Sequence, residues 1–469
     1  MNKKIGVLSL ALLITGSIDS VRNMPTVALF GSQIIFFAIL GAIFFLIPVG
    51  LVSAQLVSTK GLEGGIYGWT KAAIGKKAAF LAIWLQWINT VAWYPTILSF
   101  IAGTAAYLID PTLAQHRGYL VLIILSVFWA LTLLNLKGIK ISALIASVCA
   151  LFGMVIPMLL IIILGFVWYL QGHPLQMHLT GNNVLPHFSH SESWISLTAI
   201  ITSFLGMELA CVHVKDIHDP NRNFPRSLIF AIFFILATMI LGSLVIAWIL
   251  PQNQIHFVDG TMQVFRSLFV EYHLQWMLPV LAVMVVVGCA GEMINWMISP
   301  VKGLLFAAQD QFLPPFFTKV NKHGVAQNLL ITQACLVSLM CMAFILMPSV
   351  NGSYWLLTDL STQLYVMMYI LLFIAAICYK YKNPNISAGF QIWGNKLGMN
   401  LICALGLIGC TVTLFVGFFP PDNINVGGAL HYVVIFSLGL ILMISPAIGF
   451  YVYHRKQTAQ TKAVSELAL

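Results

Sequence analysis

Apolar segments long enough to cross a lipid bilayer recur along the whole chain, and no other sequence feature restricts its fold as strongly. Most of them reach the roughly 20 residues that a helix needs to span the hydrocarbon core. Only 8% of the 469 residues are charged, against about 25% in an ordinary soluble domain. A soluble fold of this composition could not cover its surface with polar groups, so lipid is its natural solvent. The segments are 5–30, 33–56, 78–109, 119–136, 142–170, 193–214, 225–250, 275–301, 328–347, 354–379, 398–419 and 430–453.

This pattern predicts an all-α membrane protein of about twelve transmembrane helices. The loops are short, and no linker or separate extramembrane domain is expected. We therefore expect one transmembrane domain over 1–453 and a short tail over 454–469.

The basic residues predict the orientation of the chain. Twelve spans place only Arg117 and Arg266 on one side of the membrane, and Arg22 lies inside the first span. The excess of Lys and Arg on the other side marks it as the cytoplasmic face, so both termini are expected inside. That side carries Lys3, Lys4, Lys60, Lys71, Lys76, Lys77, Lys137, Lys140, Lys215, Arg222, Arg226, Lys302, Lys319, Lys322, Lys380, Lys382, Lys396, Arg455, Lys456 and Lys462.

The net charge of +9 does not indicate nucleic-acid binding, because the basic residues form no run and are scattered between apolar segments. None of the eight cysteines stands in a CxxC motif, and we expect neither a disulfide framework nor a metal site. Four histidines of one outer loop, His173, His178, His187 and His190, are expected to be solvated rather than metal ligands. No cofactor is predicted.

Two spans contain runs that interrupt a regular helix. The first has a polar, Gly- and Pro-containing run from Thr15 to Pro25, and the sixth has a run from Thr202 to Glu208. In lipid such a break is tolerated only against protein or a water-filled cavity. The alternative is a pair of Gly-containing kinks between packed helices.

The two breaks hold corresponding positions in two halves of five helices. Interrupted segments at matching places indicate the central site of a transporter built from inverted repeats. We expect repeat one over about 5–170, repeat two over about 193–379, and two extra helices over about 398–453.

Unwound backbone suits a zwitterion such as an amino acid. Half-helix N-termini direct partial positive charge at a carboxylate, and carbonyls at half-helix C-termini accept bonds from an ammonium. The substrate-binding residues predicted on this basis are Gly16, Ser17, Ile18, Asp19, Arg22, Thr202, Ser203, Phe204 and Gly206.

Ionisable side chains within the spans are costly and are candidates for function. Asp19 and Arg22 are three residues apart, close enough to interact on a helix. Arg22 is expected to meet a substrate carboxylate or to form a gate with Asp19, and the alternative is a structural ion pair. Glu208 and Glu292 are predicted to sense or carry protons, the alternative being a structural hydrogen-bond acceptor. Trp296, one turn after Glu292, is a candidate aromatic gate or an ordinary packed residue. Asp359 is expected at the membrane interface.

Several motifs resemble those of the amino acid–polyamine–organocation superfamily. They are Gly64-Gly65-Ile66-Tyr67-Gly68-Trp69 in an inner loop, Ser203-Phe204-Leu205-Gly206-Met207-Glu208, Asp219-Pro220-Asn221-Arg222-Asn223-Phe224-Pro225 and Gln309-Asp310-Gln311-Phe312-Leu313-Pro314-Pro315.

Within that superfamily the chain is most similar to the glutamate/γ-aminobutyrate antiporter family. The similarity runs through nearly the whole chain, in Met24-Pro25-Thr26-Val27-Ala28, Phe45-Leu46-Ile47-Pro48-Val49-Gly50-Leu51, Glu292-Met293-Ile294-Asn295-Trp296, Asn321-Lys322-His323-Gly324-Val325 and Phe419-Pro420-Pro421-Asp422-Asn423-Ile424.

The resemblance implies a LeuT-like fold of five plus five helices in inverted repeat with two helices added. It also implies proton-sensitive exchange of amino acids in a plasma membrane, such as a bacterial inner membrane, with Glu208, Glu292 and Trp296 as site or gating residues. The partners it implies are a small amino-acid substrate and the lipid bilayer, with a homodimer as one assembly state.

Three departures from the family pattern bear on substrate and gating. The residues after the last predicted span, 454–469, are too few for the long cytoplasmic plug of those antiporters. Arg22-Asn23 stands where the family has an aromatic and an acidic residue, which predicts a changed preference for substrate charge. Thr202 stands where related arginine/agmatine exchangers have an aromatic that stacks on guanidinium, which disfavours arginine.

The function predicted from the sequence is therefore amino-acid antiport by alternating access. Proton- or cation-coupled uptake is the alternative, although 141–165 lacks the lysine that related proton-coupled members carry midway along the fifth span. A channel, a membrane sensor or an enzyme is disfavoured, because the sequence has no pore-lining pattern, no output domain and no clustered catalytic set.

Overall fold

The computed structural model describes residues 6–138, 148–149, 151–177, 184–186, 191–211, 217–384 and 388–467. Over these residues the chain is helical and contains no named strand, only an isolated bridge between Thr59 and Ala388. Nine of its described helices are long and apolar enough to cross a membrane. They cover Gly31–Ser58, Arg117–Leu136, Leu151–Leu170, Pro220–Ile249, Met277–Gln309, Gln327–Leu346, Val350–Lys382, Asn395–Val416 and Ala429–Arg455. The prediction of an all-helical membrane protein is confirmed.

The other three predicted spans fall on helices that miss this criterion for identifiable reasons. The third is α6 (Lys76–Ala106), which is long enough but carries a polar stripe. The first is split into α1 (Val7–Ile18), η1 (Val21–Asn23) and α2 (Met24–Ala28). The sixth is split into α11 (Ser191–Phe204) and α12 (Met207–Ala210).

The remaining elements follow the predicted segments closely. Span two runs through η2, α3, a π-helical turn η3 (Ala42–Leu46) and α4 (Ile47–Ser58). The other helices are α7 (Arg117–Leu136), η5 (Leu151–Val155), α9 (Ile156–Leu170), α13 (Pro220–Ile249), α15 (Met277–Gln309), α16 (Gln327–Met340), α17 (Ala343–Leu346), α18 (Val350–Lys382), α19 (Asn395–Val416) and α20 (Ala429–Leu467).

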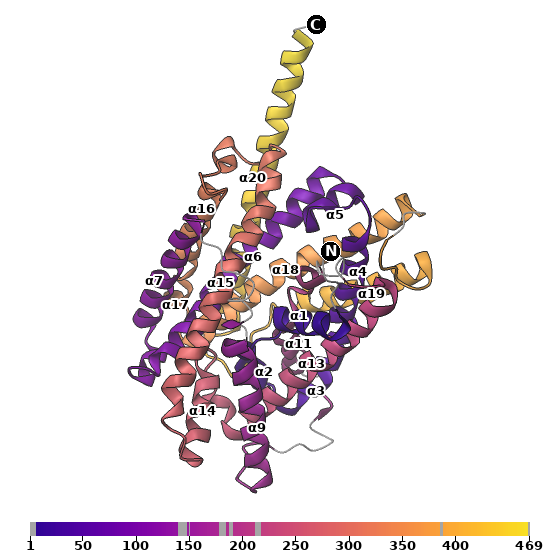
Figure 1. The fold of residues 1–469 in the computed structure, drawn as a ribbon. Coiled ribbons are helices and arrows are strands. Elements are labelled where there is room, and N and C mark those ends of the chain that lie inside the picture. The colour runs from indigo at the N-terminus through magenta and orange to yellow at the C-terminus, as the bar shows by residue number, and fades with distance from the viewer. Residues whose placement is uncertain are drawn as a thin grey trace.

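The long helices form a bundle with α6 near its centre, where it packs against α18 and α15. Two shorter helices lie at opposite ends of this bundle (Figure 1): α5 (Gly65–Ala73) at one end and α14 (Gly260–Glu271) at the other. Helix α20 continues past the predicted end of its span and projects beyond the α5 end. Its last residues are rich in Lys, Gln and Ala, which favour a helix even without packing.

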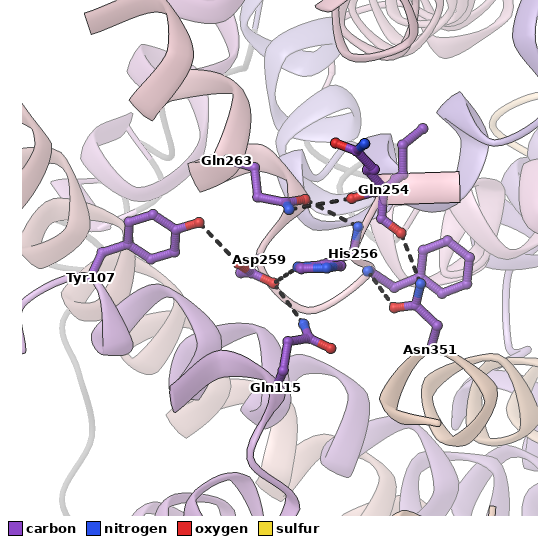
Figure 2. A network of polar contacts seen from close by, with 9 residues as sticks. Tyr107, Gln115, Gln254, His256, Asp259, Gln263 and Asn351 are labelled. Carbon is purple, nitrogen blue, oxygen red and sulfur yellow. Dashed lines mark hydrogen bonds and ion pairs between the residues drawn. The ribbon is translucent and has the colours of Figure 1, made fainter. Parts of the chain in front are cut away.

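At the α14 end, the buried carboxylate of Asp259 and the loop that carries it tie together four separate segments (Figure 2). Asp259 accepts hydrogen bonds from the Tyr107 hydroxyl (2.9 Å) and the Gln115 amide (3.2 Å), and its Oδ1 lies 3.2 Å from His256 Nδ1. Asn351, at the start of α18, holds the same loop by a hydrogen bond from the Phe257 N–H (2.9 Å). The loop between α13 and α14 thus fixes the ends of α6 and α18 relative to each other.

At the α5 end, Asp310 performs a similar linking role. Lys71 and Tyr67 of α5 both donate hydrogen bonds to its carboxylate, and Lys76 Nζ lies 3.8 Å from it. Burial alone would raise the pKa of Asp310, but the two hydrogen bonds and the two ammonium groups outweigh it and lower that pKa below its usual value. Asp310 therefore stays ionised and anchors α5 to the end of α15.

The expectation for Asp359 was wrong. It lies well inside α18, is 1% exposed, and accepts hydrogen bonds from Gln363 Nε2 (2.9 Å) and the Tyr432 hydroxyl of α20 (2.6 Å). The helix begins at Val350 rather than near residue 354. At about 1.5 Å of rise per residue, this earlier start carries Asp359 away from the interface and into the contact with the extra helices.

Glycines allow the closest helix contacts. A Cβ on Gly153 or on Gly288 of α15 would overlap the backbone of the other residue. Such small-residue contacts let helices approach in lipid, where no hydrophobic force drives them together. The contact brings η5 against α15 beside the broken helices.

Gly288→Ala is expected to destabilise the bundle by about 1–3 kcal/mol, because the added methyl group forces η5 and α15 apart. The melting temperature of the purified protein in detergent measures this. Gly449→Ala is the matched control, since a Cβ there meets nothing within 4 Å. Equal melting temperatures for the two variants would show that the close contact does not stabilise the bundle.

Candidate functional site

The first span is interrupted at two residues with extended backbone. Helix α1 ends at Ile18, and η1 begins at Val21. Between them the backbone is extended at Asp19 (φ −72°, ψ 139°) and Ser20 (φ −151°, ψ 129°). The Asp19 N–H still bonds to the Thr15 carbonyl at 2.8 Å, and this bond closes the last turn of α1. The predicted break is confirmed.

The second break lies at Leu205 and Gly206. Gly206 has φ +96°, a left-handed conformation that a side chain would strain. Its N–H donates a hydrogen bond of 3.0 Å to the Tyr369 hydroxyl of α18. A backbone group that leaves the helix ladder in lipid needs such a partner, so Tyr369 satisfies the break from outside the segment.

A cavity of about 100 Å³ lies between the two breaks. One water molecule needs about 15 Å³, so the cavity holds several waters or one small polar solute. Its wall comes from α1, η1, η5, α6, α11, α12, α15 and α18. Residues from both breaks line it: Gly16, Ile18, Asp19, Ser20, Arg22, Asn23, Thr202, Leu205, Gly206 and Leu209.

Arg22 is a buried cation in this wall. It is 5% exposed, its Nη1 donates to Thr96 Oγ1 at 2.7 Å, and its guanidinium carbon lies 5.3 Å from the centre of the Trp93 ring. Its Nε has no hydrogen-bond partner, and within the described chain no carboxylate lies within 4 Å of it. The ion pair between Arg22 and Asp19 is therefore not formed.

Asp19 instead accepts a hydrogen bond from Thr238 of α13. The two charged residues of the first break thus have separate partners, Thr238 of α13 and Thr96 of α6. Among the described side chains, none supplies a counter-ion to the guanidinium of Arg22 at the cavity.

Glu208 lies directly after the second break, in the first turn of α12 and 3% exposed. Its carboxylate accepts hydrogen bonds from Tyr365, from Tyr369 and from Gln86 Nε2 at 3.1 Å. All three donors are neutral. Tyr369 therefore joins the carboxylate of Glu208 to the freed N–H of Gly206 through one hydroxyl group.

Trp296 also lines the cavity. Its ring centre lies 5.8 Å from that of Trp93, and its carbonyl accepts a bond of 3.2 Å from the Tyr94 hydroxyl. Trp93 thus lies in contact with both Arg22 and Trp296, its ring tilted by 42° from that of Trp296. The arrangement fits both the gate and the packed residue considered from the sequence.

Two predicted site residues do not reach the cavity wall. Ser203 bonds back to the Ala199 carbonyl at 3.0 Å, and Phe204 is fully buried against Gly41 of α3 (Ile34–Gly41). Adjacent residues of a helix point about 100° apart, so only part of a contiguous run faces one side. Thr202 does line the cavity, and its hydroxyl lies 2.5 Å from that of Thr362.

Other predicted positions lie partly or wholly outside the described structure. Glu292 belongs to α15 and Ser17 to α1, but their side chains are outside the described part of the chain. The same is true of His178, His187 and His190, and of Lys3, Lys4, Lys140 and Lys215. His173 stacks on Trp168, with ring centres 4.4 Å apart.

Sequence reasoning missed the polar stripe of α6. Gln86, Asn89, Thr90 and Trp93 all line the cavity. Their spacing of three and four residues puts them on one face of a helix, and polar residues on one face of an apolar span were a signal that could have been read. Ser361 and Tyr365 of α18, four residues apart, line the cavity next to this stripe, and the Ser361 hydroxyl donates to Asn89 Oδ1 at 3.5 Å.

A family model for amino acid permeases matches residues 5–444. The chain belongs to the amino acid permease family. A transporter from Legionella pneumophila is 37% identical to it over 442 residues, which cover 94% of this chain and 95% of the relative. A glutamate/gamma-aminobutyrate antiporter from Lactococcus lactis is 27% identical over 462 residues, covering 96% and 90%. A putrescine transporter from Escherichia coli is 23% identical over 309 residues, covering 66% and 68%.

Family membership identifies this permease as a multi-pass membrane protein with a small-molecule substrate. The superfamily resemblance inferred from the motifs is confirmed, and its relatives include glutamate/gamma-aminobutyrate antiporters and polyamine transporters. These relatives are transporters rather than enzymes. The cavity between the two breaks is the candidate substrate site of this permease.

Tyr369→Phe is expected to destabilise the permease by about 1–3 kcal/mol, because the Gly206 N–H and the Glu208 carboxylate both lose a buried partner. Chemical unfolding of the purified protein measures this. Tyr169→Phe is the control, since Tyr169 is half exposed and its ring stacking on Trp248 does not need the hydroxyl. If both variants unfold alike, the Tyr369 hydroxyl does not support the break.

Proposed function

We propose that this permease exchanges amino acids across the membrane by alternating access, as an antiporter of the glutamate/γ-aminobutyrate type. The observation that carries the proposal is the guanidinium of Arg22 in the cavity between two broken helices, where none of the described side chains provides a counter-ion. A buried charge without a counter-ion is costly, and a carboxylate substrate supplies the missing charge.

The amino end of the substrate is proposed to meet the C-terminal ends of α1 and α11, which point carbonyl groups toward the breaks. The short helices α2 and α12 have only five and four residues, so their dipoles add little positive charge. Arg22 therefore takes the carboxylate in place of the half-helix N-termini that the sequence suggested. The bound ligand is a zwitterion or an acidic amino acid.

The charge of the cavity also bears on polyamines, which some relatives transport. A diamine such as putrescine has two ammonium groups and no carboxylate. Placing it beside the Arg22 guanidinium adds like charges in a site of low dielectric constant, which costs free energy. We therefore favour a substrate with a carboxylate over a diamine.

The proposed fold behind this function has about twelve spans, five plus five in inverted repeat with α19 and α20 added. Two pairs of features support it. Breaks lie in the first and sixth spans, and the short helices α5 and α14 follow the second and seventh spans at opposite ends of the bundle (Figure 1). Opposite ends are what an inverted repeat requires, because five helices bring the chain to the other face.

The proposed orientation places the α5 end in the cytoplasm of a bacterial inner membrane. The basic residues gather on that side, and the relatives named above are bacterial.

Glu208, Glu292 and Trp296 are proposed as gating or proton-sensing groups. For Glu208 the support is its place beside the break and its neutral partners, which leave room for proton uptake during the cycle.

Uptake of labelled glutamate or γ-aminobutyrate into proteoliposomes tests the exchange. Vesicles preloaded with an unlabelled amino acid are expected to take up label, and empty vesicles are not, because an antiporter returns across the membrane only with a bound substrate. Uptake into empty vesicles driven by a proton gradient would indicate coupled uptake instead.

With Glu208→Gln, the difference in exchange rate between pH 5 and pH 7 is expected to shrink, since the amide does not titrate.

Arg22→Gln tests the carboxylate contact. The variant is expected to weaken the binding of glutamate and of neutral amino acids alike, by about tenfold or more, because each loses a charge-assisted hydrogen bond to its carboxylate. The KM for each substrate in counterflow measures this. Arg266→Gln is the control, since Arg266 is exposed on α14. KM values that Arg22→Gln leaves unchanged for both kinds of substrate would reject Arg22 as a substrate ligand.

A further inference from the structure

A second hollow lies on the side of the bundle where α18 ends and α19 begins, with the start of α13 as its third wall. It has a volume of about 610 Å³ and is lined by Asn221, Lys380, Gln391, Trp393, Gly394 and Asn395, among others. None of its lining residues lines the cavity between the broken helices. It is therefore a separate site, and its interpretation does not rest on the proposed transport function.

Lys380 is the buried cation of this hollow. It stands in the last turn of α18, is 9% exposed, and lines the hollow on one side. No hydrogen bond or ion pair joins it to any residue of the described chain. Lys382 on the same turn, by contrast, donates to the Ala73 carbonyl at 2.7 Å. The Lys380 side chain is therefore largely buried, and its ammonium group is left to solvent or to a ligand that fills the hollow.

The N-terminus of α19 opens into the same hollow. This helix has 22 residues, and its N-cap residue, Gly394, makes no side-chain capping bond. The first N–H groups of a helix have no acceptor within the helix, and the helix dipole makes this end partly positive. Gly394 and Asn395 therefore present donors in the same space as the Lys380 ammonium group.

Asn221 of α13 closes the third side. Its Oδ1 accepts a hydrogen bond of 2.8 Å from the Gln391 N–H, which leaves the Asn221 amide NH₂ as a further donor. None of the described residues that line the hollow is acidic. Three separate segments thus contribute a cation, helix N–H groups and an amide to one space.

We propose that this hollow binds a phosphate group. A helix N-terminus with a nearby lysine is a natural phosphate site, because the N–H groups and the ammonium donate to different oxygens of one anion. The phosphate belongs either to a free phosphate species in solution or to the headgroup of an anionic phospholipid. Both present the same chemistry to Lys380.

The surroundings make the headgroup a realistic source. Trp393 is 64% exposed and Leu397, one turn further along α19, is 78% exposed. Tryptophan is enriched where a membrane protein meets the lipid headgroups. Trp393, which lines the hollow, and Leu397 thus give it an exposed apolar border that suits contact with lipid.

The test uses the full-length permease purified into lipid nanodiscs. In one arm, inorganic phosphate is titrated against protein in neutral phosphatidylcholine discs, with sodium chloride as the ionic-strength control. In the other arm, the melting temperature is compared between phosphatidylcholine discs and discs containing phosphatidylglycerol. Binding in the first arm identifies free phosphate as a ligand, and stabilisation only in the second identifies the lipid headgroup.

Lys380→Gln is expected to lower the affinity for whichever of the two ligands binds by about tenfold, or to abolish the stabilising effect of that ligand, since a charge-assisted bond is lost. Asn221→Asp places a negative charge in the hollow and is expected to weaken binding similarly, while its carboxylate still accepts the Gln391 N–H. This exposed position tests the proposal even where Lys380→Gln fails to fold. Lys396→Gln is the control, because the Lys396 ammonium lies over the Tyr381 ring, 4.9 Å from its centre, and does not line the hollow.

A phosphate or phosphatidylglycerol effect that is lost in Lys380→Gln or Asn221→Asp and kept in Lys396→Gln supports the site. An effect that all three variants keep, or that all three lose equally, overturns it, because it then reflects general surface charge. Absence of any effect of either probe on the wild-type permease also overturns it.

Discussion

Every backbone N–H and C=O that leaves a helix inside a bilayer must find a partner, and this requirement organises the structure. At the first break, Asp19 and Ser20 are extended, and the Val21 carbonyl accepts a hydrogen bond of 3.2 Å from Thr261 Oγ1 of α14. At the second, the Gly206 N–H donates to the Tyr369 hydroxyl of α18. These partners come from other helices, so the breaks can exist only where such helices surround them. The cavity is the space between these interruptions, and its polar lining follows from the need to satisfy them.

The charged side chains inside the bundle also need partners, but the acidic and the basic ones are held in different ways. Asp19, Glu208 and Asp359 are each held by neutral hydroxyl or amide donors from other helices. Arg22 donates a hydrogen bond to Thr96 and lies over the face of the Trp93 ring, and it lines the cavity. Among the described side chains, no carboxylate lies within 4 Å of it. An anionic group that enters the cavity would supply a counter-ion, which links the polarity of the cavity to the proposed substrate.

The ends of the bundle are held by ionic clusters that leave the centre free. Asp259 joins α6 to the loop before α14 at one end, and Asn351 of α18 holds the same loop (Figure 2). Asp310 joins α5 to α15 at the other end. Both clusters involve α6 or its flanking loops, and α6 also carries the polar stripe of the cavity. Alternating access requires one end to open while the other stays closed. These two clusters are the contacts that such a motion would have to break in turn.

The sequence by itself determined the membrane class, the positions of the apolar segments and the two breaks, because hydrophobic length and Gly- or Pro-containing polar runs are local properties. It also pointed to the superfamily through short motifs. It did not determine which residues of each break face the cavity: Thr202 does, whereas Ser203 and Phe204 do not. Nor did it show that Asp359 is buried between α18 and α20, or that Asp19 and Arg22 have separate partners. Those outcomes depend on how helices far apart in the chain rotate and pack against one another, and a single residue of rotation turns a side chain by about 100°.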